Sequence, residues 1–102
     1  MEIKAKQIGE LIANQIKENF KETFAIEYGE SYVEIVYNGQ WYKNKAVFKS
    51  ECGEELLYFF AWNTKQQEYQ ETAYLKCHRF LNNPAFWAGY VCGGLMGAKR
   101  FD

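Results

Sequence analysis

The stretch Glu54–Trp62 reads Glu-Glu-Leu-Leu-Tyr-Phe-Phe-Ala-Trp and is the most apolar run in the sequence. Its length, its aromatic content and the polar residues on either side are typical of a β-strand. One face of such a strand would meet the core, and the other face would also carry large apolar side chains. We therefore expect the remaining elements to be organised around this strand.

Three earlier segments are expected to join it in one antiparallel sheet. Apolar and polar residues alternate over 23–28 and 33–37, and a third strand is expected over 41–50. Gly29-Glu30 and Asn38-Gly39 are typical of two-residue hairpin turns. The sequence therefore predicts a four-stranded antiparallel meander.

The two turns also predict which residues lie opposite one another. The first turn sets Ile26 opposite Val33, and the second sets Ile35 opposite Tyr42, so that one face collects apolar side chains. Asn44 falls on this same apolar face, where it is the one poor fit.

The N-terminal segment is expected to form an amphipathic helix over residues 2–20. Its apolar residues recur at helical spacing on one stripe: Ile8, Leu11, Ile12, Ile16 and Phe20. This stripe would cover one face of the sheet.

Two further helices are expected after the apolar strand. Thr64 and Gln67 have the form of a capping box, and apolar residues at helical spacing continue from there as far as Phe80. Asn83 as N-cap and Pro84 at the first helical position would end that helix and begin the next. Close packing against a neighbour is the expected role of three glycines in this last helix, Gly89, Gly93 and Gly97.

The predicted fold is therefore a two-layer α+β domain in the order α-β-β-β-β-α-α, with the helices on one face of the sheet. The 102 residues suffice for one domain with a single modest core. Aromatic residues make up 19% of the chain, which is more than such a core requires. The formal net charge of −1 lacks the overall positive field typical of proteins that bind duplex DNA.

The cysteines and the N-terminus bear on the cellular compartment. Cys52, Cys77 and Cys92 are an odd number without a C-x-x-C pair, which favours a reducing compartment over a disulfide framework or a zinc site. The N-terminal residues lack the apolar segment of a signal peptide, and no apolar run approaches the length of a membrane span. A cytoplasmic protein is the expectation.

The outer face of the predicted sheet would interleave lysines with aromatic rings. A two-residue turn at Cys52-Gly53 sets Lys45 opposite Phe60 and turns Trp62 outward. The candidate binding residues on this face are Tyr32, Trp41, Lys43, Lys45, Lys49, Tyr58, Phe60 and Trp62. A three-residue turn, Glu51-Cys52-Gly53, would reverse every side chain of the strand and send Tyr58, Phe60 and Trp62 into the core.

Three interpretations of this face remain open. The lysine stems and the rings could shield one another, or the last helix could cover the face. Aromatic side chains could instead anchor a protein partner or a second copy of the chain. Single-stranded nucleic acid or a nucleotide could stack on the rings with lysines at the phosphates, although no RNP-like motif is present.

Catalytic motifs are not evident in the sequence. Cys77 and His78 are adjacent in the predicted helix, so their side chains would point about 100° apart and could not form a nucleophile–base pair. Neither these residues nor the other cysteines have the spacing of a recognised metal site. A cysteine nucleophile remains a third, less favoured possibility.

We therefore expect a small, non-catalytic binding protein that requires no cofactor and presents an aromatic-rich surface to a protein partner. Inhibitors of host enzymes encoded by phages or other mobile elements are one class of such proteins. A binder of nucleotides or single-stranded nucleic acid is the alternative, and its affinity would fall steeply with salt.

Overall fold

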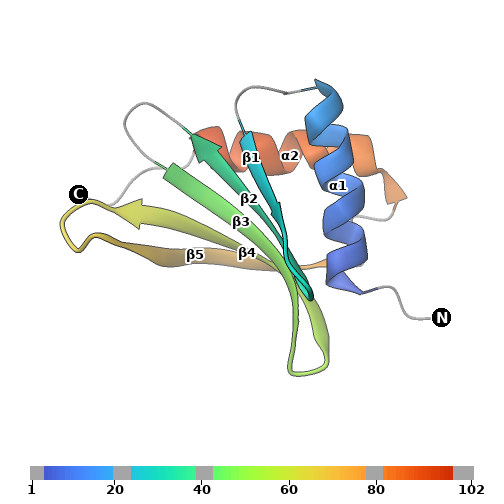
Figure 1. Ribbon diagram of the computed structural model, residues 1–102, viewed down its shortest axis with the longest axis horizontal. Coiled ribbons are helices and arrows are strands. Elements are labelled where there is room, and N and C mark those ends of the chain that lie inside the picture. Colours follow the sequence, from blue (N-terminus) through green and yellow to red (C-terminus); the bar gives the residue numbers. More distant parts are fainter. Residues whose placement is uncertain (1–3, 20–23, 39–42, 78–81, 98–102) are drawn as a thin grey trace.

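The computed structural model describes residues 4–19, 24–38, 43–77 and 82–97, which form five strands and two helices (Figure 1). The elements in order are α1 (Ala5–Asn19), β1 (Phe24–Tyr28), β2 (Tyr32–Asn38), β3 (Lys43–Glu51), β4 (Glu54–Asn63), β5 (Glu68–Lys76) and α2 (Pro84–Gly97). The strands form one antiparallel sheet in the order β1-β2-β3-β4-β5, and both helices pack on the same face of it. The predicted two-layer α+β fold with an N-terminal helix is thus confirmed.

The prediction of a helix after Thr64 is wrong, because this part of the chain forms the edge strand β5. The described sheet therefore has five strands and not the predicted four. In place of the expected capping box of Thr64 and Gln67, the side chain of Asn63 makes the capping hydrogen bonds, and they stabilise a turn. The Asn63 side-chain oxygen accepts hydrogen bonds from the backbone N–H groups of Lys65 and Gln66, each at 3.0 Å. Gln67 then adopts a positive φ of 56°, and the chain returns along β4.

The first two predicted hairpin registers are wrong, although every described residue lies on its predicted face. Ile26 lies opposite Ile35, and Ile35 lies opposite Ala46. The turn between β1 and β2 is Glu30-Ser31, since the Gly29 N–H donates to the Tyr32 carbonyl oxygen at 2.9 Å. A side chain at Gly29 would meet the Tyr32 ring, whose nearest atom lies 2.0 Å from the position of a Cβ. The predicted turn at Gly39 lies outside the described residues.

The turn between β3 and β4 is the predicted two-residue turn at Cys52-Gly53. Glu51 lies opposite Glu54, and the two turn residues have φ values of 52° and 80°. Such a pair of positive φ angles is typical of a type I′ turn. The three-residue alternative is therefore wrong, and Tyr58 points away from the helices.

The core lies between the inner face of the sheet and the two helices. Ile8, Ile12 and Ile16 of α1 are buried as predicted, whereas Leu11 is 46% exposed; Phe20 lies outside the described residues. The inner face of the sheet contributes Val33, Ile35, Ala46, Phe48 and Leu57. Asn44 is fully buried on this face, which is the face predicted for it from the alternation along the strand.

Helix α2 begins as predicted, because the Asn83 side-chain oxygen accepts a hydrogen bond from the Phe86 N–H at 3.2 Å. The glycine prediction is wrong for Gly89 and Gly93, whose Cβ positions have no neighbour within 4 Å among the described residues. Gly94 makes the close contact instead, since its Cβ position lies 3.3 Å from the Phe59 ring. Gly97 is the last residue of the helix, and the prediction for its packing lies outside what the structure describes.

Candidate functional site

The outer face of the sheet is the candidate site, and we call it the open face. It consists of the outward-pointing residues of β2 to β5, because residues that lie opposite one another across an antiparallel pair share a face. Both described helices pack on the inner face, so α2 does not cover the open face. One of the two shielding alternatives from the sequence is thus removed.

Seven of the eight predicted binding residues lie on strands of the described sheet, and their register places them on the open face. They are Tyr32, Lys43, Lys45, Lys49, Tyr58, Phe60 and Trp62. The eighth residue, Trp41, lies outside the described residues. The remaining alternative, mutual shielding, accounts for part of the surface, since Val47 and Leu56 are only 9% and 5% exposed.

Lysine ammonium groups lie over aromatic rings on the open face. The Lys45 ammonium is 4.2 Å from the centre of the Tyr69 ring and 5.3 Å from that of Phe60. The Lys49 ammonium is 4.9 Å from the centre of the Tyr58 ring. Distances below about 6 Å allow a cation–π attraction. The predicted interleaving of lysines and rings is therefore present.

The sequence prediction missed the contribution of β5 to this face. Tyr69 lies opposite Trp62 with their rings edge to face, and Tyr74 lies opposite Tyr58. Glu71 lies opposite Phe60 and also points outward. The signal was hidden because the pairing between β4 and β5 is irregular at Phe59/Phe60, which breaks the alternation along β5.

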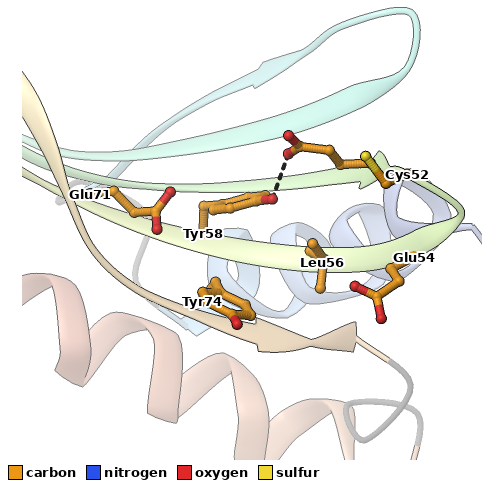
Figure 2. A pocket seen from close by; sticks show the side chains of 7 residues that line it. Cys52, Glu54, Leu56, Tyr58, Glu71 and Tyr74 are labelled. Atoms are coloured by element: carbon orange, nitrogen blue, oxygen red, sulfur yellow. Dashed lines mark hydrogen bonds between the residues drawn. The ribbon is translucent and has the colours of Figure 1, made fainter.

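Two shallow hollows lie on the open face. The first, of about 350 Å³, is bordered by Tyr32, Lys45, Lys49 and Phe60, and we call it the lysine hollow. The second, of about 320 Å³, is lined by Glu51, Cys52, Glu54, Leu56, Tyr58, Glu71 and Tyr74, and we call it the tyrosine hollow (Figure 2). The lysine hollow thus has two lysines and Glu34 in its lining, whereas the charged residues that line the tyrosine hollow are all glutamates.

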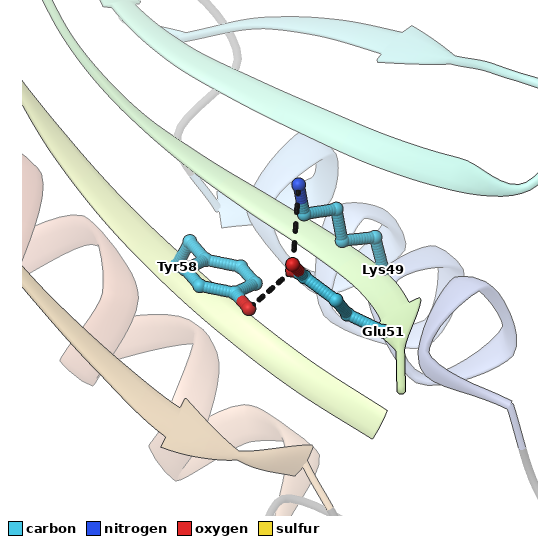
Figure 3. Close-up of polar contacts among 3 residues, drawn as sticks. All are labelled: Lys49, Glu51 and Tyr58. Atoms are coloured by element: carbon cyan, nitrogen blue, oxygen red, sulfur yellow. Dashed lines mark hydrogen bonds and ion pairs between the residues drawn. The ribbon is translucent and has the colours of Figure 1, made fainter. Parts of the chain in front are cut away.

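Tyr58 in the tyrosine hollow is held in place by Glu51. Its hydroxyl group donates a hydrogen bond to the Glu51 carboxylate, which also pairs with the Lys49 ammonium at 3.7 Å (Figure 3). The hydrogen bond to Glu51, assisted by partial burial, raises the pKa of Tyr58 to about 12. The Tyr58 hydroxyl therefore stays protonated near neutral pH and acts as a donor, not as a base.

The cysteines offer one accessible thiol. Cys52 is exposed in the turn between β3 and β4, while Cys77 and Cys92 are buried. Burial raises the pKa of the Cys77 thiol to about 12 and that of Cys92 to about 11. His78 lies outside the described residues, and within the described ranges no three potential ligands among His, Cys, Asp and Glu are placed to hold a metal ion.

Comparison of the chain with protein-family models, with curated proteins and with solved structures found no match in any of the three. Neither α1 nor α2, the helices in the described part of the chain, is long and apolar enough to cross a membrane.

Proposed function

We propose that this chain is a small binding protein with no catalysis of its own, and that its open face binds a protein partner. The observation that carries the proposal is a row of aromatic rings, one exposed and the others partly exposed, on a sheet face that the described helices leave uncovered. Tyr74 is 59% exposed there, beside the half-buried ring of Tyr58. Tyrosine and tryptophan side chains anchor protein interfaces because they bury a large area and lose little conformational entropy.

The mixed charge of the open face supports a protein partner over a nucleic acid. Lys45 pairs with the Glu34 carboxylate at 3.8 Å, and Lys76 pairs with Glu54 at 3.5 Å. Carboxylates beside the lysines would repel a phosphate backbone and would reduce the counterion release that dominates nucleic-acid affinity. The nucleotide or single-stranded nucleic-acid alternative is therefore the weaker proposal.

The identity of the partner decides whether the chain inhibits an enzyme or connects other proteins as an adaptor. A phage-encoded or mobile-element inhibitor would use such a face to occlude a surface of a host enzyme. A second copy of this chain could also occupy the face, and sedimentation of the purified protein over a range of concentrations would detect that association.

The test is a matched pair of tyrosine substitutions. Tyr74→Ser removes an exposed ring from the open face, and Tyr90→Ser removes a ring that is 46% exposed on α2. Wild-type protein and both variants are used to capture partners from native lysate, and captured proteins are then tested individually for affinity. We expect a direct partner that binds the wild type and Tyr90→Ser but is lost with Tyr74→Ser.

Footprinting of the resulting complex provides the second readout. The partner should protect Tyr58 and Trp62 from hydroxyl-radical oxidation and leave Tyr90 unprotected. Protection of α2 instead, or equal loss of binding with both variants, would place the interface elsewhere and overturn the proposal.

A further inference from the structure

The tyrosine hollow combines two aromatic rings with an excess of negative charge. The ring centres of Tyr58 and Tyr74 are 6.1 Å apart, with an angle of 38° between the ring planes. Figure 2 shows the two rings on neighbouring strands, with Glu71 at one end of the row and Glu54 at the other. Glu51 borders the same hollow, and no lysine or arginine is among its lining residues in the described part of the chain.

The lysines nearest this hollow already pair with two of its three glutamates. Lys49 pairs with Glu51 at 3.7 Å, and Lys76 pairs with Glu54 at 3.5 Å. Glu71 has no such ion pair with any described residue, yet its charge reaches the hollow, because it contributes to the raised pKa of Tyr58. One carboxylate therefore remains to neutralise an incoming positive group.

The shape of the hollow suits a side chain with an apolar stem and a positive end. Leu56 lines the hollow beside the two rings and is only 5% exposed. The Lys49 ammonium already lies over the Tyr58 ring, and the face of the Tyr74 ring can attract a further cation through its quadrupole. Lysine and arginine have this construction, since their methylene stems pack on apolar groups while the charged end meets a carboxylate.

We propose that the tyrosine hollow binds a lysine or arginine side chain of the protein partner, with its charged end at Glu71 and its stem against Tyr58 and Tyr74. The proposal rests on the proposed function, and it specifies which chemistry the partner presents. Charge complementarity selects this occupant, because an acidic side chain would meet three carboxylates and a purely apolar one would leave Glu71 without a counter-ion.

The test uses the purified chain without any partner, so that it can fail while the open-face proposal stands. N-acetyl-lysine amide and N-acetyl-arginine amide are titrated into the protein, and binding is followed by NMR signals of the Tyr58 and Tyr74 rings. N-acetyl-norleucine amide, which has the lysine stem without the ammonium group, is the neutral control. Saturable shifts with the two cations, and none with the neutral compound, are the expected result.

A matched pair of glutamate variants tests whether the Glu71 carboxylate is the group that meets the charged end of the bound side chain. Glu71→Gln and Glu68→Gln make the same change on β5, but Glu71 lies opposite Phe60 on the open face and Glu68 lies opposite Asn63 on the inner face. We expect Glu71→Gln to weaken binding of both cations about two- to fivefold and Glu68→Gln to leave it unchanged. The variant spectra also report whether the fold is retained.

Three results would overturn this inference. The cations could fail to shift the two rings, the norleucine compound could bind equally well, or the two glutamate variants could weaken binding equally. If a partner is nevertheless lost with Tyr74→Ser, the open face is its binding surface and only the cationic anchor is wrong. If the cations bind but the partner binds the Tyr74→Ser variant as well as the wild type, the hollow is a cation site and the proposed function is wrong.

Discussion

Asn44 on the inner face of β3 donates a hydrogen bond from its side-chain nitrogen to the Leu95 backbone carbonyl oxygen at 2.9 Å. Leu95 lies in the last turn of α2, where carbonyl groups have no partner within the helix. Asn44 is fully buried, and its side-chain oxygen accepts no hydrogen bond from the described residues. Asn44, the residue that fits the apolar pattern least well, thus joins the end of α2 to the sheet.

The substitution Asn44→Asp should destabilise the protein strongly. It replaces the donating amide by a buried carboxylate that faces a carbonyl oxygen, and we expect a loss of about 3–5 kcal/mol in the free energy of unfolding. Asn44→Ala, which removes the hydrogen bond without adding a charge, should cost about 1–3 kcal/mol. Urea denaturation of both variants measures the difference, and equal stabilities of the two would contradict the role assigned to Asn44.

Gly9 and Gly93 should respond in opposite ways to alanine. A Cβ at Gly9 would lie 2.9 Å from atoms of Phe48 and Val33, so Gly9→Ala should push α1 off the sheet and cost about 1–3 kcal/mol. A Cβ at Gly93 would meet no atom of the described part of the chain within 4 Å, so Gly93→Ala should stabilise α2 by about 0.5–1 kcal/mol. Thermal denaturation of the two variants tests both signs, and stabilisation by Gly9→Ala would show that α1 does not pack this closely.

The faces of the first strands were predictable even though their registers were not. The side-chain direction in a strand repeats every two residues, so a shift by two or four residues leaves each side chain on its face. Ile35 lies opposite Ala46, four residues along the chain from the predicted partner Tyr42, and the Ile35 and Ala46 side chains both face the core. For this reason the lysines of β3 lie on the predicted face although their predicted partners are wrong.

The last strand was not predictable from the same pattern. Tyr69 and Glu71 point outward on one side of the irregular pairing at Phe59/Phe60, and Tyr74 and Lys76 point outward beyond it. The extra residue in β5 changes the spacing from two to three, which spoils the alternation and mimics helical spacing. The tyrosine hollow depends on Glu71 and Tyr74, so it could not be found from the sequence.

Glu55 should give an acid-dependent contribution to stability. Its carboxylate accepts a hydrogen bond from the Ala5 N–H at the start of α1 at 2.6 Å and another from the Ser50 hydroxyl group. The Ser50 hydrogen bond, together with that from Ala5 and the nearby Lys4 charge, lowers the pKa of Glu55 from its ordinary value of 4.5. A lowered pKa stabilises the folded state above pH 4.5, and this stabilisation is lost as the pH falls through the folded-state value.

The variant Glu55→Gln removes the charge and should cost about 0.5–1 kcal/mol at pH 7, a small value because solvent screens the site. The difference in unfolding free energy between wild type and variant should shrink as the pH falls below 4.5. Urea denaturation at several pH values measures it, and a difference independent of pH would show that the Glu55 charge has no effect on stability.

The three cysteines should differ in reactivity. Cys52 is exposed, whereas burial raises the pKa values of Cys77 and Cys92. We expect iodoacetamide to label one cysteine in the folded protein at neutral pH and all three in denaturant, because the thiolate is the reacting form. Intact mass measures the labelling, with Cys52→Ser as the control. Rapid labelling of the folded Cys52→Ser variant would reopen the possibility of a cysteine nucleophile.

Tyr58 should lose its unusual titration when Glu51 is changed. The hydrogen bond to Glu51 is the main cause of the pKa of about 12, and the Glu71 charge contributes less. Glu51→Gln should therefore bring the pKa of Tyr58 back toward 10, and Glu71→Gln should lower it only slightly. The signal of the Tyr58 ring in an NMR titration measures both shifts, and Tyr58→Phe assigns it.

The hydrogen bond between Tyr58 and Glu51 should also make the stability of the protein depend on pH in alkaline solution. The pKa of Tyr58 is raised by folding, so its stabilising contribution is complete below pH 10 and is lost as the pH rises toward 12. The destabilisation caused by Glu51→Gln should accordingly be present at pH 9 and should diminish above pH 10, because the unfolded wild-type protein then ionises Tyr58 while the folded protein still has to keep its hydroxyl group protonated. Urea denaturation across this range tests the prediction. A destabilisation that stays constant up to pH 12 would mean that the hydrogen bond between Tyr58 and Glu51 does not stabilise the fold.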